Sequence, residues 1–269
     1  MPMKILPWPT SSLAKKYVTA VTGTLLILFV LAHMAGNLLI FAGPDALNSY
    51  AHHLQSLGPL LWVARIGLLV IFVIHLLATL QLRHENAKAR PQRYAYEQTL
   101  QASWASRHML LTGVVLLLFV LYHLAHFTFG VVKKTDFQVA SASGTIHQFD
   151  DGKRNYRELV EEKQGNRYVP RPDKKYSDFK NNPDADIRHD VYSMVVSGFR
   201  DPLISSSYLL AMIFLALHLW HGGSSFLQTL GANNPAWAPY IARLGPVLAI
   251  LVLLGNSSIV LAVWLRIVN

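Results

Sequence analysis

The sequence predicts an all-α, polytopic membrane protein in which five transmembrane helices form one bundle, a single domain over residues 1–269. Of these residues, 52% are hydrophobic and only 14% are charged, a balance typical of membrane proteins. Five apolar runs are each long enough to cross ~30 Å of hydrocarbon as a helix. The chain has no cysteine, which excludes disulfides, thiolate-held iron–sulfur clusters and covalently attached c-type haem.

The apolar runs predict spans, in chain order, at about 17–41, 60–82, 108–132, 203–228 and 240–264. The first run is too long for the apolar part of a signal peptide, so we expect it to be retained as a span. The segment 42–59 is predicted to be a short loop, and the long polar segment 133–200 an irregular external loop. Residues 190–199 have apolar side chains at helical spacing and are expected to form an interfacial helix that packs on the bundle.

Basic residues predict the orientation of the chain, with its N-terminus in the cytoplasm. Three lysines precede the first span and five Lys or Arg lie in 83–107, whereas 42–59 has none, and positive charge gathers on the cytoplasmic side of membrane proteins. The net charge of +9 comes from such loops and does not indicate nucleic-acid binding. Arg65 lies near the outer end of the second span, either as a snorkelling side chain or as a partner for an acidic ligand group.

A repeat of twelve residues marks two histidines inside the membrane. Residues 22–33, TGTLLILFVLAH, and 112–123, TGVVLLLFVLYH, are identical at eight positions, including the final His33 and His123. At a rise of ~1.5 Å per residue, both histidines lie at a similar depth in the outer half of the bilayer. Histidine is costly in hydrocarbon unless it has partners, so intramembrane histidines are candidates for function.

Two further histidines share an inner layer. His75 in the second span and His218 in the fourth reach a common depth, because both spans run inward. We call His75 and His218 the inner pair, and His33 and His123 the outer pair. His126 and His221 follow His123 and His218 by three residues and share their helix faces; the repeat favours His123, and the shallower position of His221 favours His218.

Paired histidines on facing helices suit haem iron with an imidazole on each side, or a carboxylate-bridged metal pair. No Asp or Glu lies within the five predicted spans, so the pattern favours two haem b groups. Gly23 and Gly113 each precede an outer histidine by ten residues, where the edge of a flat macrocycle could approach the backbone. Close helix packing explains these glycines as well. His126 and His221 are candidates for contacts to a ligand or to haem propionates.

With these residues in place, the chain resembles the five-helix, di-haem cytochrome b subunits of succinate dehydrogenases and fumarate reductases, the b558 family. The resemblance covers nearly the whole chain, including the DVYSMVVSGF end of the long loop. It rests on LAHMAGNLLIF, LNSYAHHLQSL, IHLL, LFVLYHLAHF and LHLWHGGSSFLQTLG, in that order. It implies that the first and third helices ligate one haem and the second and fourth the other, which is the pairing that depth proposes.

The resemblance implies an electron-transfer subunit in the bacterial cytoplasmic membrane. A flavoprotein subunit would oxidise succinate, an iron–sulfur subunit would carry the electrons, and this chain would pass them to menaquinone or ubiquinone, or run the path in reverse. The chain has no cysteine and no flavin or nucleotide motif, so none of its residues is expected to convert succinate. The basic segment 83–107 is a candidate dock for the iron–sulfur subunit, although a solvated cytoplasmic loop explains its charges equally well.

By analogy with that family, quinone is expected near a haem at a membrane edge. Hydrogen-bonding side chains at the outer edge make candidates of His52, His53, Gln55 and Ser56, and an ordinary polar loop and helix start would explain them too. Haem propionates also need donors, for which the candidates are Arg65 at the outer edge and Arg107 or His108 at the inner edge.

Two other classes of protein stay open. One is the cytochrome b subunit of a formate dehydrogenase or hydrogenase, or a haem-based transmembrane reductase, with the same bis-histidine ligation. The other is a haem-free transporter or anchor whose histidines relay protons or only pack. Acidic residues within spans or interrupted spans would favour the transporter, and neither is evident. Its remaining support, Asn256, Ser257 and Ser258 in the fifth span, is explained by hydrogen bonds between helices.

Overall fold

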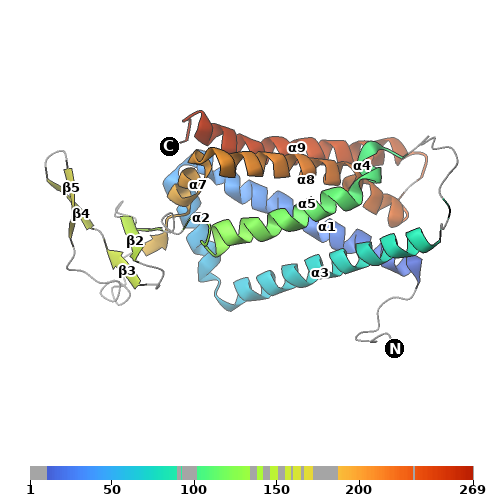
Figure 1. Ribbon diagram of the computed structural model, residues 1–269, viewed down its shortest axis with the longest axis horizontal. Coiled ribbons are helices and arrows are strands. Elements are labelled where there is room, and N and C mark those ends of the chain that lie inside the picture. Colours follow the sequence, from blue (N-terminus) through green and yellow to red (C-terminus); the bar gives the residue numbers. More distant parts are fainter. Residues whose placement is uncertain are drawn as a thin grey trace. The chain divides into compact units, whose positions relative to one another are not determined.

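The structure is a computed structural model that describes residues 11–89, 92, 102–133, 138–141, 146–150, 155–158, 160–164, 167–171, 187–232 and 234–268. Five of its helices are long and apolar enough to cross a membrane, which confirms the predicted fold class (Figure 1). They are α1 (Ser12–Asn37), α3 (Pro59–Lys88), α5 (Met109–His123), α8 (Pro202–Thr229) and α9 (Ala238–Trp264). Two short segments extend the first and third spans: the 3-10 helix η1 (Leu38–Ala42) and the π-helix η2 (Leu124–Thr128).

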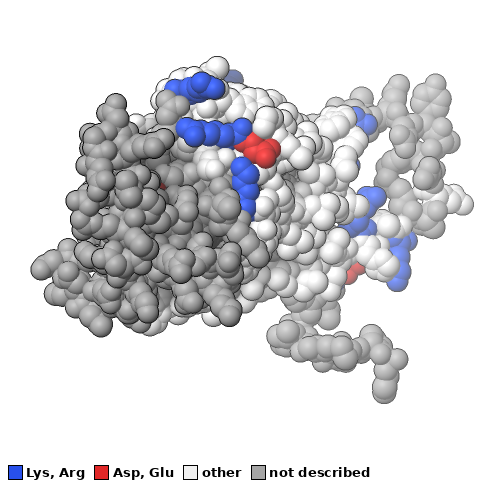
Figure 2. Space-filling view, turned by 60° about the vertical axis from the view of Figure 1, so that its left-hand side comes forward, with Lys and Arg blue, Asp and Glu red and all other residues white. Residues whose placement is uncertain are grey.

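The exposed surface of these helices is apolar. Large hydrophobic side chains stay exposed along the spans, for example Leu28 at 57%, Leu69 at 60% and Leu118 at 61%. Figure 2 shows a face on which Lys, Arg, Asp and Glu occupy only a few places of the described surface. Soluble monomers rarely expose contiguous apolar surface of this extent. The chain is therefore a multi-pass membrane protein.

The segment between the first two spans forms a helix, which the sequence analysis did not predict. This helix, α2 (Pro44–Ser56), has Pro44 at its first position, where the missing backbone N–H costs nothing. Gly43 and Gly58 bound it with positive φ angles of 99° and 53°, a conformation that glycine adopts without steric cost. The prediction of a short loop over 42–59 was therefore wrong. This helix buries few residues, among them Leu47 and Asn48, so its polar sequence does not differ from that of a loop.

The long polar segment carries short strands where the sequence predicted an irregular loop. A four-stranded antiparallel sheet has the order β3-β2-β1-β6, and β4 pairs with β5. The strands are β1 (Gln138–Ser141), β2 (Ile146–Asp150), β3 (Asn155–Glu158), β4 (Val160–Gln164), β5 (Arg167–Arg171) and β6 (Ile187–His189). The predicted helix at the end of this segment is confirmed as α7 (Val191–Arg200). A short helix, α4 (Trp104–Arg107), precedes α5.

The chain divides into two compact units. Unit 1 consists of Met1–His33, Pro59–Val114 and Ile213–Leu253, and unit 2 of Met34–Gly58, Val115–Met212 and Leu254–Asn269. The inner pair therefore belongs entirely to unit 1. In the outer pair, His33 belongs to unit 1 and His123 to unit 2.

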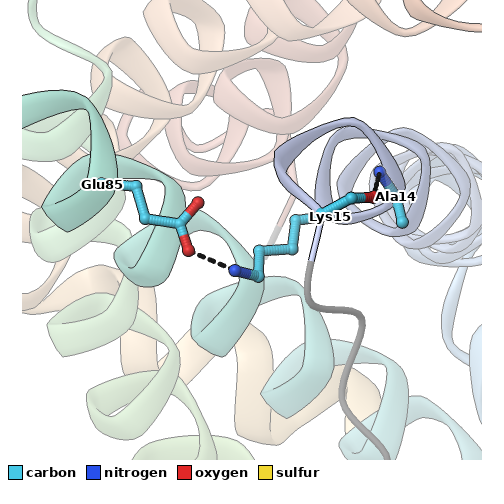
Figure 3. A network of polar contacts seen from close by, with 4 residues as sticks. Ala14, Lys15 and Glu85 are labelled. Atoms are coloured by element: carbon cyan, nitrogen blue, oxygen red, sulfur yellow. Dashed lines mark hydrogen bonds and ion pairs between the residues drawn. The ribbon is translucent and has the colours of Figure 1, made fainter. Parts of the chain in front are cut away.

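In unit 1, α1 and α3 run antiparallel. Lys15 near the start of α1 forms an ion pair with Glu85 near the end of α3 (Figure 3). Further along, Thr22 of α1 contacts His75 of α3, so the residue number rises on one helix while it falls on the other. This is the up-and-down order that the positions of the basic loops predict for the first two spans.

Unit 2 has an apolar core that covers α7. Buried residues from several elements form this core, including Ile40, Tyr192, Phe199, Tyr208 and Ile259. Asp190 caps the N-terminus of α7 and accepts a hydrogen bond from the Ser193 N–H at 3.0 Å. Because Asp190 also accepts from Asn48 Nδ2 at 3.0 Å, polar contacts tie α7 to α2.

Candidate functional site

The inner pair is held by two matched hydrogen bonds within unit 1. Thr22 Oγ1 lies 3.1 Å from His75 Nδ1, and Thr112 Oγ1 lies 3.0 Å from His218 Nδ1. Both threonines are buried, at 7% and 0% exposure, whereas both imidazoles are only partly covered by protein. The first residue of each repeat copy thus contacts one histidine of the inner pair.

The hydroxyl protons of these threonines are already committed to the backbone. Thr22 Oγ1 donates to the carbonyl of Val18 at 2.7 Å, and Thr112 Oγ1 donates to the carbonyl of Met109 at 3.1 Å. A hydroxyl has one proton, so the remaining interaction of each oxygen is as an acceptor. The Nδ1–H of each imidazole therefore donates to its threonine. This tautomer leaves Nε2 unprotonated, with a lone pair that can bind a metal ion.

The glycine that follows each threonine adjoins the same histidine. A Cβ atom at Gly23 would lie 3.2 Å from His75 Cε1, and one at Gly113 would lie 3.8 Å from His218 Cε1. We expected a haem edge or close helix packing to explain these glycines. The structure places an imidazole from another helix against each of them, which agrees with close helix packing, and the haem edge stays a prediction.

His218 also lies within electrostatic range of two other imidazoles, those of His75 and His221. The structure thereby brings the two members of the inner pair into one region of unit 1, which depth along the spans predicted. His221 is on the next turn of α8 and is half-buried, so it stays a candidate for a contact near this site. In the described residues, no group of three or more His, Asp or Glu could hold a metal ion.

One face of α1 carries buried polar groups from Thr22 back to Lys15. Thr19 and Lys15 precede Thr22 by three and seven residues and so share its face. The hydroxyl oxygen of Thr19 is buried and has no hydrogen-bond partner among the described residues. The Lys15 side chain is 6% exposed and pairs with Glu85, which is 39% exposed (Figure 3). A buried hydroxyl without a partner is costly, which indicates that this face receives a polar group.

The outer candidates have a different environment. His33 is exposed and stacks on Phe29, with the ring centroids 5.4 Å apart. In unit 2, the hydroxyl of Tyr208 lies 3.3 Å from His123 Nδ1 and 3.1 Å from His126 Nδ1. The π-helix η2 begins directly after His123, and π-helical turns often occur at functional sites. The pairing of His33 with His123 stays a prediction, because the two residues belong to different units.

The structure places the predicted quinone contacts on α2. His52, His53, Gln55 and Ser56 are all exposed there. Ser56 Oγ is occupied locally, because it donates to the His53 carbonyl at 2.7 Å. The buried polar residue of α2 is Asn48, which contacts α7. The four exposed residues are open to a ligand, but no contact among them builds a pocket in the described part of unit 2.

The predicted propionate donors lie at exposed helix ends. The Arg65 guanidinium lies 5.2 Å from the Trp62 ring centroid, as expected for a cation held at an interface. His108 stacks on Trp104 at 4.1 Å, and its Nδ1 donates to the Trp104 carbonyl at 2.8 Å. Arg107 is exposed. Much of the basic segment 83–107, the candidate dock for an iron–sulfur subunit, falls outside the described residues.

Comparison with known proteins does not assign the chain to a family. No family model, curated protein or solved structure matches it. The resemblance to the b558 cytochromes therefore stays a prediction.

Five residues near the candidate histidines were not predicted from the sequence: Thr22, Thr112, Lys15, Thr19 and Tyr208. For the two threonines a signal was present, because they open both copies of the repeat. Tyr208 is buried at 5% exposure with its hydroxyl between two imidazoles, and nothing in its sequence neighbourhood distinguishes it from a packing residue.

Proposed function

We propose that this chain is the membrane-anchor cytochrome b subunit of a succinate:quinone oxidoreductase of the bacterial cytoplasmic membrane. His75 and His218 would hold an inner haem b, and His33 and His123 an outer one. A flavoprotein subunit and an iron–sulfur subunit would be its partners, and membrane quinone its electron acceptor or donor. The observation that carries the haem assignment is the matched pair of hydrogen bonds that leaves Nε2 of both inner histidines ready to bind iron.

The residues around the inner pair fit a haem b group. Two imidazoles with free Nε2 lone pairs suit bis-histidine ligation, and both rings are only partly covered by protein. The unpartnered hydroxyl of Thr19 would donate to an acidic propionate group. When bound, haem b supplies a carrier that accepts and gives up one electron at a time. The protein's own part is to fix the two rings.

The basic end of unit 1 is the proposed docking side for the iron–sulfur subunit. Exposed Lys16, Arg83, Lys88, Arg107 and Arg243 all belong to unit 1, and the ion pair of Lys15 with Glu85 places the start of α1 beside the end of α3. Positive charge on this side also agrees with the proposed cytoplasmic N-terminus. An acidic face on the partner would speed association and fix its orientation.

The test of this function is electron transfer from succinate. Membranes that contain this chain together with a flavoprotein and an iron–sulfur subunit should show haem reduction when succinate is added, and re-oxidation when quinone is added. His75→Ala and His218→Ala should abolish the response of the inner haem. If formate or hydrogen reduces the haems and succinate does not, the chain belongs to another quinone-linked oxidoreductase and the proposal is wrong.

A further inference from the structure

We infer that Thr22 and Thr112 are positioning residues of the inner pair that fix the tautomers of His75 and His218 and lower the reduction potential of the haem between them. This inference rests on the proposed function and extends it to two residues that do not bind the iron. It assigns the first position of the repeat to the inner haem and its last position to the outer haem.

The two contacts have the same pattern of partners, with two differences: Gly23 lies nearer its imidazole than Gly113 does, and Thr22 Oγ1 also lies 3.3 Å from the Thr19 carbonyl. Each threonine lies on a spanning helix, and each receives Nδ1–H from a histidine on another helix at 3.0–3.1 Å. Each donates its own proton to a backbone carbonyl of its helix, and each precedes a glycine that adjoins the same imidazole. One contact of this kind could be incidental to packing, but a pair built from both copies of an internal repeat indicates a common role.

Backbone bonding alone does not explain these threonines. Threonine in a membrane helix commonly donates to the carbonyl four residues earlier, and Thr24 does so with Ala20 at 2.8 Å. Thr24 lies two residues from Thr22 on the same helix, yet no described hydrogen bond joins it to a histidine. Unlike this neighbour, Thr22 is buried, lies 3.3 Å from the Thr19 carbonyl and has a further interaction, with His75 Nδ1.

The second interaction affects an iron ligand directly. A hydrogen bond from Nδ1–H to an acceptor increases the electron density of the imidazole and fixes the ring orientation. A more basic ligand stabilises ferric over ferrous iron, because the oxidised ion has the higher charge. Both threonines would act in the same direction, each through its own histidine, so their effects on the potential of the inner haem should add.

The test is a potentiometric titration of the purified full-length protein, followed by its visible spectrum. Thr22→Val and Thr112→Val remove the acceptor while keeping the side-chain shape. Each should shift the ferric-to-ferrous ratio at a fixed potential about three- to tenfold toward ferrous iron. At 59 mV per tenfold for one electron, the inner haem potential rises by about 30–60 mV. The double variant should show the sum, and the outer haem should not change.

Three controls separate this role from packing. Thr24→Val removes a hydroxyl with the same backbone bond and should leave both potentials unchanged. Thr22→Ser and Thr112→Ser keep the acceptor oxygen and should retain the wild-type potential of the inner haem. Thr22→Ala and Thr112→Ala provide second hydroxyl-free variants if a valine variant does not accumulate.

The outcomes are distinct from those that test the proposed function. If wild-type protein binds two haems but the hydroxyl-free variants titrate like Thr24→Val, the haem assignment stands and the role of the threonines is refuted. Serine variants that behave like the valine variants would also refute it, because the hydroxyl would then not be the cause. A wild-type protein without haem would overturn both proposals.

Discussion

Alanine at the two repeat glycines should affect the two inner histidines unequally. A Cβ atom at position 23 would lie 3.2 Å from His75 Cε1, and one at position 113 would lie 3.8 Å from His218 Cε1. Optimal carbon–carbon separations are ~3.5–4.0 Å. Gly113→Ala therefore makes an ordinary contact, whereas Gly23→Ala requires the His75 ring to move by a few tenths of an ångström.

The magnitude follows from what that movement changes. In the middle of a helix, alanine is more favourable than glycine by ~0.5–1 kcal/mol, and Gly113→Ala should keep this gain. In Gly23→Ala, the displaced ring weakens a hydrogen bond to Thr22 that contributes ~0.5–1.5 kcal/mol, and it holds a strained rotamer at a cost of ~0.5–1.5 kcal/mol. We expect Gly113→Ala to be neutral or stabilising, and Gly23→Ala to be destabilising by about 1–2 kcal/mol.

The assay is thermal unfolding in detergent together with haem content and the visible spectrum. Gly23→Ala should lower the midpoint and alter the inner haem, and Gly113→Ala should do neither. If both variants behave alike, the difference between 3.2 and 3.8 Å has no consequence for the rings, and the expected asymmetry is refuted. A third variant, Gly67→Ala in α3, has nothing within 4 Å of its added Cβ and gives the effect of helix propensity alone.

The contacts of Glu85, Tyr208 and Asn48 give three more tests. Glu85→Gln should lower the unfolding midpoint more than Lys15→Met does. The Glu85→Gln variant leaves the buried Lys15 ammonium without its partner, a loss of up to ~3–5 kcal/mol, whereas in Lys15→Met the remaining Glu85 is 39% exposed and can turn to water. Equal losses in the two variants would contradict this asymmetry. Tyr208→Phe should change the spectrum and potential of the outer haem and leave the inner haem as in wild type, since the Tyr208 hydroxyl contacts His123 and His126. A change confined to the inner haem would refute the assignment. Asn48→Leu should destabilise the protein by ~1–3 kcal/mol and increase protease cleavage of residues 133–200. The reason is that the substitution removes a hydrogen-bond partner of buried Asp190 and of the Tyr192 N–H. Resistance to protease equal to that of wild type would show that this contact does not hold α7.

The spans could be predicted from the sequence because long apolar runs have few other stable structures. The predicted span at 203–228 differs from α8 by one residue at each end, and the predicted helix at 190–199 is α7. The bounds of α2 and of the strands β1–β6 were not predicted. These elements are short and polar, and their pattern does not differ from that of a loop.

Part of the candidate site could also be predicted. Depth along the helices places His75 and His218 in one layer, because the rise per residue is fixed. Depth does not give the rotation of each helix, so the sequence alone could not show that Thr22 meets His75 or that Gly23 adjoins the same ring. For this reason the imidazole beside each glycine and the role of the buried Tyr208 were not predicted.

The central claim is that paired histidines hold two b haems, and haem stoichiometry tests it most directly. The purified protein should contain two haems per chain, with a reduced-minus-oxidised spectrum of b type. His75→Ala and His218→Ala should each remove or alter the same haem, and His33→Ala and His123→Ala the other. A chain that binds no haem when it is supplied, or four variants that keep both haems intact, would contradict the account and leave the histidines to proton relay or packing.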